Sequence, residues 1–135
     1  GAYNRIAQLS EEQKAKGVIC ASAGNHAQGV ALAAKNLGIK AVIVMPQTTP
    51  EIKVRSVRDH GAKVVLKGDA FDEAAAHAQE LIAKHGYTYI PPYDDPDVIA
   101  GQGTVGLELS SQAKDLGVKL DAVIIPCGGG EVLRD

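Results

Sequence analysis

The chain has 135 residues and a formal net charge of −2 at pH 7, which fits one domain, or one domain with a fragment of a second. Because 45% of its residues are apolar and 22% are charged, the composition excludes a disordered chain. The small net charge argues against a broad surface for nucleic acid or acidic membranes. No apolar run has the length of a membrane span, and two isolated cysteines do not make a disulfide framework. We therefore expect a cytoplasmic protein with neither a nucleic-acid nor a membrane partner.

The first half of the chain alternates short apolar runs with segments of helical periodicity. Ser10 and Gln13 form a capping-box pattern that opens a short helix. The apolar runs are rich in β-branched residues and are bounded by Gly, Asp or Pro, which is typical of buried parallel strands. In chain order, the patterns predict a strand over 18–21, a helix over 27–37 that ends at Gly38, a strand over 41–45, and a helix over 52–58 that starts after Pro50.

The second half continues the alternation. In chain order, it predicts a strand over 64–66, a helix over 71–82 capped by Asp69 and ended by Gly86, a strand over 87–90, a helix over 98–116 and a strand over 122–125. Strands that alternate with helices imply right-handed crossovers between parallel strands. We therefore expect an α/β fold: a three-layer, doubly wound, mainly parallel sheet of about four to five strands flanked by helices.

The loop after the first predicted strand is the main candidate site, because ligands of doubly wound sheets bind at the carboxyl ends of the strands. It consists of Ser22, Ala23, Gly24, Asn25 and His26. Glycine lets the backbone approach a ligand, and the helix start offers N–H groups and the positive end of a dipole. The loop therefore predicts a cradle for a small carboxylate or phosphate. An ordinary helix N-cap without a ligand is the alternative.

Two glycine-rich segments are further candidates. Gly128, Gly129 and Gly130 follow the last predicted strand, where successive N–H groups can turn inward on a phosphate; a flexible tail is the alternative. Residues 101–106 match the pattern G-x-G-x-x-G. A turn-rich loop, not a strand, precedes them, so a nicotinamide dinucleotide site is the less favoured interpretation.

The remaining chemistry-bearing side chains are assigned to structural roles, and no metal site is expected. A turn followed by a helix cap accounts better than a metal cluster for the three neighbouring carboxylates Asp94, Asp95 and Asp97. Three histidines lack metal-ligand spacing and are assigned to the solvated surface: His60, His77 and His85.

Residues 20–31, with the sequence CASAGNHAQGVA, closely resemble the Ser-x-Gly-Asn-His-x-Gln-Gly segment of the threonine ammonia-lyase (threonine dehydratase) family, to which serine racemase and serine dehydratase are similar. Residues 44–46, 53–54, 68–73 and 91–104 resemble the same family in the same order. The resemblance extends from residue 1 to about residue 130. It implies a pyridoxal 5′-phosphate enzyme of fold type II that converts L-threonine, or L-serine, by loss of ammonia; from threonine the product is 2-oxobutanoate.

The resemblance also implies roles for individual residues. Ser22, Ala23, Gly24, Asn25 and His26 match the loop that receives the carboxylate of the amino-acid substrate, and Asn25 also matches the residue that hydrogen-bonds the 3′ oxygen of the cofactor. The three glycines at 128–130 match part of the loop that holds the cofactor phosphate. Residues 1–120 correspond to the small α/β domain, and residues 121–135 to a returning strand and a truncated phosphate loop of the large domain.

Two departures from the family pattern limit what the chain alone is expected to do. The lysine that forms the Schiff base would lie three residues before Gly1, and none of the ten lysines present has its setting. Glu131 replaces the fourth glycine of the phosphate loop. We therefore expect a small-domain fragment with no catalytic residue of its own, inactive as an ammonia-lyase. Without its large domain the fragment should self-associate through exposed apolar surface. A non-catalytic engineered or excised α/β folding or binding module is the alternative.

Overall fold

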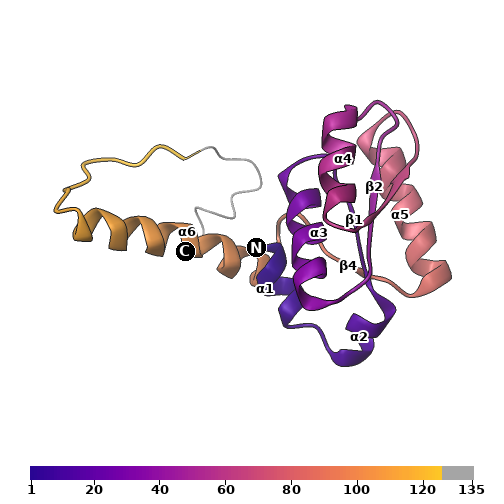
Figure 1. Ribbon diagram of the computed structural model, residues 1–135, viewed down its shortest axis with the longest axis horizontal. Coiled ribbons are helices and arrows are strands. Elements are labelled where there is room, and N and C mark those ends of the chain that lie inside the picture. The colour runs from indigo at the N-terminus through magenta and orange to yellow at the C-terminus, as the bar shows by residue number, and fades with distance from the viewer. Residues whose placement is uncertain (126–135) are drawn as a thin grey trace.

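The computed structural model describes residues 1–125 of the chain. It forms an α/β body from which one long helix projects (Figure 1). The elements in chain order are α1 (Ala2–Ala7), α2 (Glu11–Lys16), β1 (Val18–Ala21), α3 (Asn25–Leu37), β2 (Ala41–Met45), α4 (Glu51–Asp59), β3 (Lys63–Leu66), α5 (Phe71–His85), β4 (Thr88–Tyr89) and α6 (Pro96–Asp115).

The four strands form one parallel sheet in the order β3-β2-β1-β4. The register pairs Val18 with Ala41 on one side and with Thr88 on the other. This arrangement confirms the predicted α/β fold and four of the five predicted strands. Strand β4 is shorter than expected, because only two of its residues pair with β1.

Helices cover both faces of the sheet, so the two central strands are buried throughout. Side chains of α1, α3 and α4 pack with alternate strand residues on one face, and α5 packs on the other face. Burial on both sides explains why β1 and β2 are continuous apolar runs rather than alternating patterns. The first layer is built around Ile6, Val30, Ala34, Ile43 and Val54, and the second around Ile19, Val42, Val44, Ala74 and Ala78.

The strand order creates a switch point between β1 and β4. From β1 the chain crosses to β2 and β3 on one side, and α5 then carries it back to β4 on the other side of β1. The segments that leave the carboxyl ends of β1 and β4 lie side by side at this end of the sheet, and the region between them, where doubly wound sheets bind ligands, is called the crevice. The loop 22–24 and the segment that follows Tyr89 flank this crevice.

The helix ends confirm most of the predicted caps. Ser10 Oγ accepts a hydrogen bond from Gln13 N at 3.2 Å while Gln13 Oε1 accepts one from Ser10 N at 3.0 Å, which is the predicted capping box. Gly38 and Gly86 end their helices with φ of 68° and 72°, in the left-handed region that favours glycine.

The predicted cap of α5 by Asp69 is wrong. The helix begins after Ala70, and Glu73 reaches back to accept hydrogen bonds from the backbone N–H groups of Asp69 and Ala70. A carboxylate in the first turn satisfies these N–H groups directly and also meets the positive end of the helix dipole.

The predicted strand over 122–125 is also wrong. These residues form neither helix nor strand, and Ile124 is 98% exposed. A strand exists only if its backbone finds a partner strand, and α6 carries this segment away from the sheet (Figure 1). The apolar pattern was present, but the tertiary partner was not.

Helix α6 starts where the sequence places a cap. Asp95 Oδ1 accepts hydrogen bonds from Asp97 N at 3.0 Å and from Val98 N at 3.1 Å. The assignment of this aspartate to a helix cap is therefore confirmed. Within residues 1–125, no cluster of His, Cys, Asp or Glu is placed to hold a metal ion, and no helix is long and apolar enough to cross a bilayer.

Candidate functional site

The loop 22–24 joins the end of β1 to the start of α3 and is held by its own hydrogen bonds. Ser22 N donates to Val44 O of the neighbouring strand at 3.1 Å. Ser22 Oγ accepts from Gly24 N at 3.3 Å, which closes a local serine turn. The turn brings the chain from a buried strand to a helix start within three residues, at the carboxyl end of the sheet.

The N-terminus of α3 faces the crevice without a capping side chain. Gly24 is the N-cap residue, and no side-chain cap is present among the described residues. The first backbone bond of the helix runs from Gln28 N to Gly24 O at 3.4 Å. A Cβ added to Gly24 would meet no described atom within 4 Å, so the space beside this residue is open. The first-turn N–H groups of α3 and the positive end of its dipole form an arrangement that suits an anion.

A cavity of about 460 Å³ lies next to this helix start, within the usual size range for small-ligand sites. It brings together α1, α3, the start of α6 and the segment after β4. Asn25 and His26 line it, whereas the other three predicted loop residues do not. The lining contains no lysine; it consists of Gly1, Ala2, Tyr3, Asn25, His26, Gly29, Leu32, Ala33, Asn36, Pro92, Val98 and Gln102.

The ring of His26 makes a contact that sequence reasoning missed. Its Nε2 lies 2.9 Å from the carbonyl oxygen of Ile90, a residue 64 positions away in the chain. Ile90 follows β4, so this hydrogen bond crosses the switch point from α3 to the opposite side of the crevice. No local pattern signals such a partner, because the partner is defined only by the strand order.

The cysteine beside the site is not a nucleophile. Cys20 is a free, buried residue of β1, and burial raises the pKa of its thiol to about 12. The thiol is therefore protonated at neutral pH. Burial also raises the pKa of Tyr89 in β4, with smaller contributions from Cys20 and Tyr93.

The two glycine-rich candidates have different outcomes. Gly128, Gly129 and Gly130 lie outside the described residues. Residues 101–106 lie inside α6, and a Cβ on Gly101 would come within 2.8 Å of Gly1 Cα. A dinucleotide fingerprint needs a strand, a tight turn and a helix start. The nicotinamide interpretation is therefore wrong, because these glycines belong to a helix interior, where Gly101 permits the close approach of α1.

Comparison with known proteins places the chain in a family. The family model described as pyridoxal-phosphate dependent enzyme matches residues 1–133. The chain belongs to the pyridoxal-phosphate dependent enzyme family. This result confirms the resemblance inferred from residues 20–31 and the cofactor that it implies for the family.

Curated relatives of this family member include several threonine dehydratases. The chain is 58% identical over 133 residues to threonine dehydratase 1 biosynthetic, chloroplastic, of Solanum lycopersicum, covering 98% of this chain and 22% of that protein. It is 57% identical over 130 residues to L-threonine dehydratase biosynthetic IlvA of Escherichia coli strain K12, covering 96% and 24%. The chain thus spans about a quarter of the length of these relatives.

Solved structures of related proteins contain the same fold. The processed form of threonine deaminase isoform 2 from Solanum lycopersicum superposes with a TM-score of 0.88 at 58% identity, over 97% of this chain and 35% of that one. Maize serine racemase superposes with a TM-score of 0.90 at 37% identity, over 98% and 39%. The four-stranded parallel sheet and its helices are therefore a conserved part of these larger proteins.

Proposed function

We propose that this chain is part of a pyridoxal-phosphate dependent ammonia-lyase that converts L-threonine, or L-serine, to a 2-oxo acid and ammonia; from threonine the product is 2-oxobutanoate. The observation that carries the proposal is the uncapped start of α3 at the switch point, on a chain 58% identical to a threonine dehydratase. In the reaction, the loop before α3 and the start of α3 hold the carboxylate of the substrate, through Ser22, Ala23, Gly24, Asn25 and His26.

The loop offers the groups that a carboxylate needs. The first-turn N–H groups of α3 are donors, and the helix dipole adds a partial positive charge. Ser22 Oγ already accepts from Gly24 N, so its hydroxyl proton remains for donation to a ligand oxygen. A carboxylate held by two such donors has a fixed orientation, and the Cα–H bond of the substrate is oriented with it.

The described residues fit one edge of the cofactor. The exposure of Asn25 and its position in the cavity lining support its assignment as a side-chain donor to the 3′ oxygen, and the open space beside Gly24 leaves the backbone accessible to a ligand there. When bound, pyridoxal phosphate supplies an electron sink for negative charge at the substrate Cα. Holding the phosphate is assigned to Gly128, Gly129 and Gly130.

The isolated chain should not catalyse the reaction. No lysine lines the cavity formed by the described residues, so no lysine side chain is placed there to hold the cofactor covalently or to move the Cα proton. A positioned general base alone contributes about 10²–10⁴-fold to a rate. We expect no 2-oxobutanoate from the chain mixed with pyridoxal phosphate and L-threonine, so that on its own it behaves as a non-catalytic binding module.

Carboxylate binding by residues 22–26, called the carboxylate seat below, is tested by titrating the ¹⁵N-labelled chain with L-threonine. The matched control is L-threoninamide, which lacks the carboxylate. We expect L-threonine to shift the backbone amide signals of residues 24–27 and L-threoninamide to leave them in place. Equal shifts with both compounds, or shifts confined to other residues, would contradict the assignment.

Apolar side chains are exposed on the outer part of α6 and on the segment after it, and they lead to a proposal about partners. In the longer protein this surface, on the outer part of α6 and the segment after it, packs against the remaining chain, which includes the large domain. In the isolated chain the same surface binds a second copy. The cytoplasm is retained as the proposed compartment, although plant relatives are named as chloroplastic.

A further inference from the structure

The side chain of His26 is turned away from the helix axis and across the switch point. It is the second residue of α3, and its Nε2 lies 2.9 Å from Ile90 O. A carbonyl oxygen can only accept a hydrogen bond, so Nε2 carries the proton and donates it. Through Nε2 the ring is therefore bonded to the residue that directly follows β4.

The acceptor of this bond is rigidly held. Ile90 is fully buried, and its own N–H donates to Ile19 O of β1 at 2.9 Å. The carbonyl of the same residue is thus fixed by the parallel pairing of β1 with β4. A bond from His26 to this carbonyl links the start of α3 to a part of the sheet that cannot easily move.

The rest of α3 gives its N-terminus little directional support. The buried residues of α3 are four alanines and one valine: Ala27, Val30, Ala31, Ala33 and Ala34. Leu37 packs partly buried against the same core at the far end of the helix. Apolar burial is non-directional. It therefore opposes separation of α3 from the sheet more strongly than it opposes a small translation or rotation of α3. The first turn also lacks a side-chain cap within residues 1–125. The hydrogen bond from His26 to Ile90 O is a directional contact that, together with the serine turn at Ser22 and Gly24, can fix where the first N–H groups point.

We propose that His26 is a positioning residue: its ring, bonded to Ile90 O, sets the direction of the α3 N-terminus, while its backbone N–H and not its ring serves the carboxylate. The inference rests on the proposed function and assigns the ring a role apart from ligand contact. A glutamine at position 26 retains an N–H donor of similar reach, whereas a leucine retains the volume but has no donor. Binding should therefore survive the first change and not the second.

The experiment uses the whole chain and sodium acetate as the carboxylate probe, with sodium chloride at equal ionic strength as the blank. Acetate affinity is measured from the amide shifts of residues 24–27 in the wild type, His26→Gln, His26→Leu and the matched control His77→Leu, which alters α5 on the opposite face. A long-range ¹H–¹⁵N spectrum of the histidine rings reports which ring nitrogen of His26 carries the proton.

We expect Nε2 to be protonated, His26→Gln and His77→Leu to bind acetate within about threefold of wild type, and His26→Leu to bind about tenfold more weakly, which is the loss of one hydrogen bond. Equal binding by wild type and His26→Leu, or an unprotonated Nε2, would overturn the positioning role alone. Absence of any wild-type response to acetate would overturn the carboxylate seat and, with it, the role of His26. If His26→Gln binds as weakly as His26→Leu, the donor is not what matters and the inference is also wrong.

Discussion

At the scale of single residues, glycine is used where two helices must touch. Gly101 of α6 lies against the start of α1, and a Cβ at this position would come within 2.7 Å of Gly1 N and 2.9 Å of Asn4 Cβ. Gly106 lies in the same helix, yet a Cβ there would meet no described atom within 4 Å. The two glycines therefore have opposite requirements, although both sit in a helix interior.

This contrast predicts opposite effects of the same substitution. Gly101→Ala should lower the free energy of unfolding by about 1–3 kcal/mol, because the added methyl group forces α1 and α6 apart. Gly106→Ala should raise it by about 0.5–1 kcal/mol, because alanine is the better helix former and nothing obstructs it. Urea unfolding of both variants against wild type measures the two values, and destabilisation of equal size in both would show that the close approach at Gly101 is not the cause.

At the scale of elements, the first turns of α6 attach it to α1 and so to the body. Asn4 Nδ2 donates to Asp97 O at 2.8 Å, and Arg5 Nε lies 3.0 Å from Asp95 Oδ2. Asp95 thus has two roles: one carboxylate oxygen caps α6 and the other pairs with α1. Both roles act on the same junction, which also borders the cavity.

Substitution of Asp95 can separate these roles. Asp95→Ala removes the cap and the ion pair and should lower the free energy of unfolding by about 1–2 kcal/mol. Asp95→Asn keeps an acceptor for the helix N–H groups and removes only the charge, so we expect a loss of less than about 1 kcal/mol, given that the ion pair is partly exposed to solvent. Thermal and urea unfolding give both values, and equal losses would mean that the cap contributes little.

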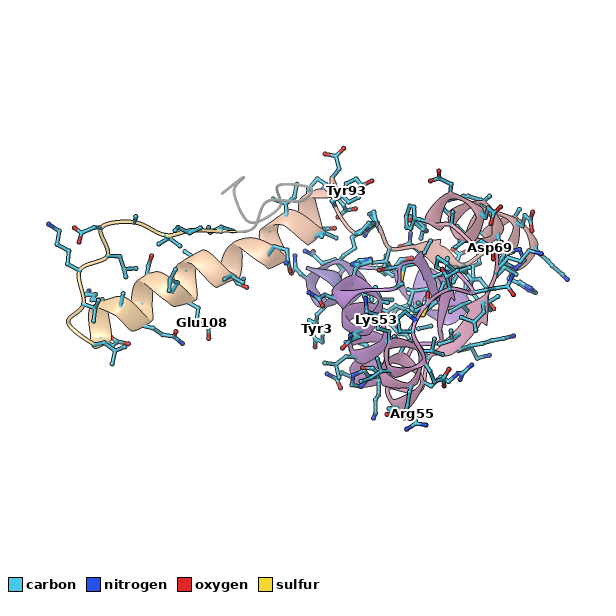
Figure 2. All side chains as sticks on the ribbon, turned by 90° about the horizontal axis from the view of Figure 1, so that it is seen from above. Tyr3, Lys53, Arg55, Asp69, Tyr93 and Glu108 are labelled. Carbon is cyan, nitrogen blue, oxygen red and sulfur yellow. The ribbon has the colours of Figure 1, made fainter. Side chains whose placement is uncertain are left out.

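At the scale of the whole molecule, the outer part of α6 leaves apolar surface without a partner in the described chain. Glu108 marks the part of the helix that stands clear of the body, whereas Tyr3 lies at the junction (Figure 2). Val98 is buried, and residues seven, eleven and eighteen positions further lie on the same side of the helix: Val105, Leu109 and Leu116. An exposed stripe of this kind promotes association.

The proposed self-association can be tested with one charge. Leu116 is 77% exposed within the apolar surface, and Ile52 is 78% exposed but isolated on α4. We expect the wild-type weight-average mass in sedimentation equilibrium to rise with concentration, Ile52→Lys to behave the same, and Leu116→Lys to remain monomeric. A wild-type chain that stays monomeric at about millimolar concentration, or two variants that behave alike, would rule out this surface as the interface.

The sequence by itself determined the elements whose causes are local. The apolar runs of β1 and β2, the alanine-rich face of α3 and the cap residues Ser10 and Asp95 predicted structure correctly, because periodicity and capping act within a few residues. Family membership was also readable from residues 20–31. The local pattern failed at Asp69: the N-cap residue is Ala70, and Glu73 accepts hydrogen bonds from the backbone N–H groups of Asp69 and Ala70.

Only the tertiary structure decided the features that depend on distant partners. The apolar residues 122–125 did not become a strand, because a strand requires an edge to pair with and α6 leads away from the sheet. The placement of α3 against the crevice, and the bond from His26 to Ile90 O, follow from the order β3-β2-β1-β4. Hydrogen bonds between residues 64 positions apart arise from the path of the chain, which no local pattern encodes.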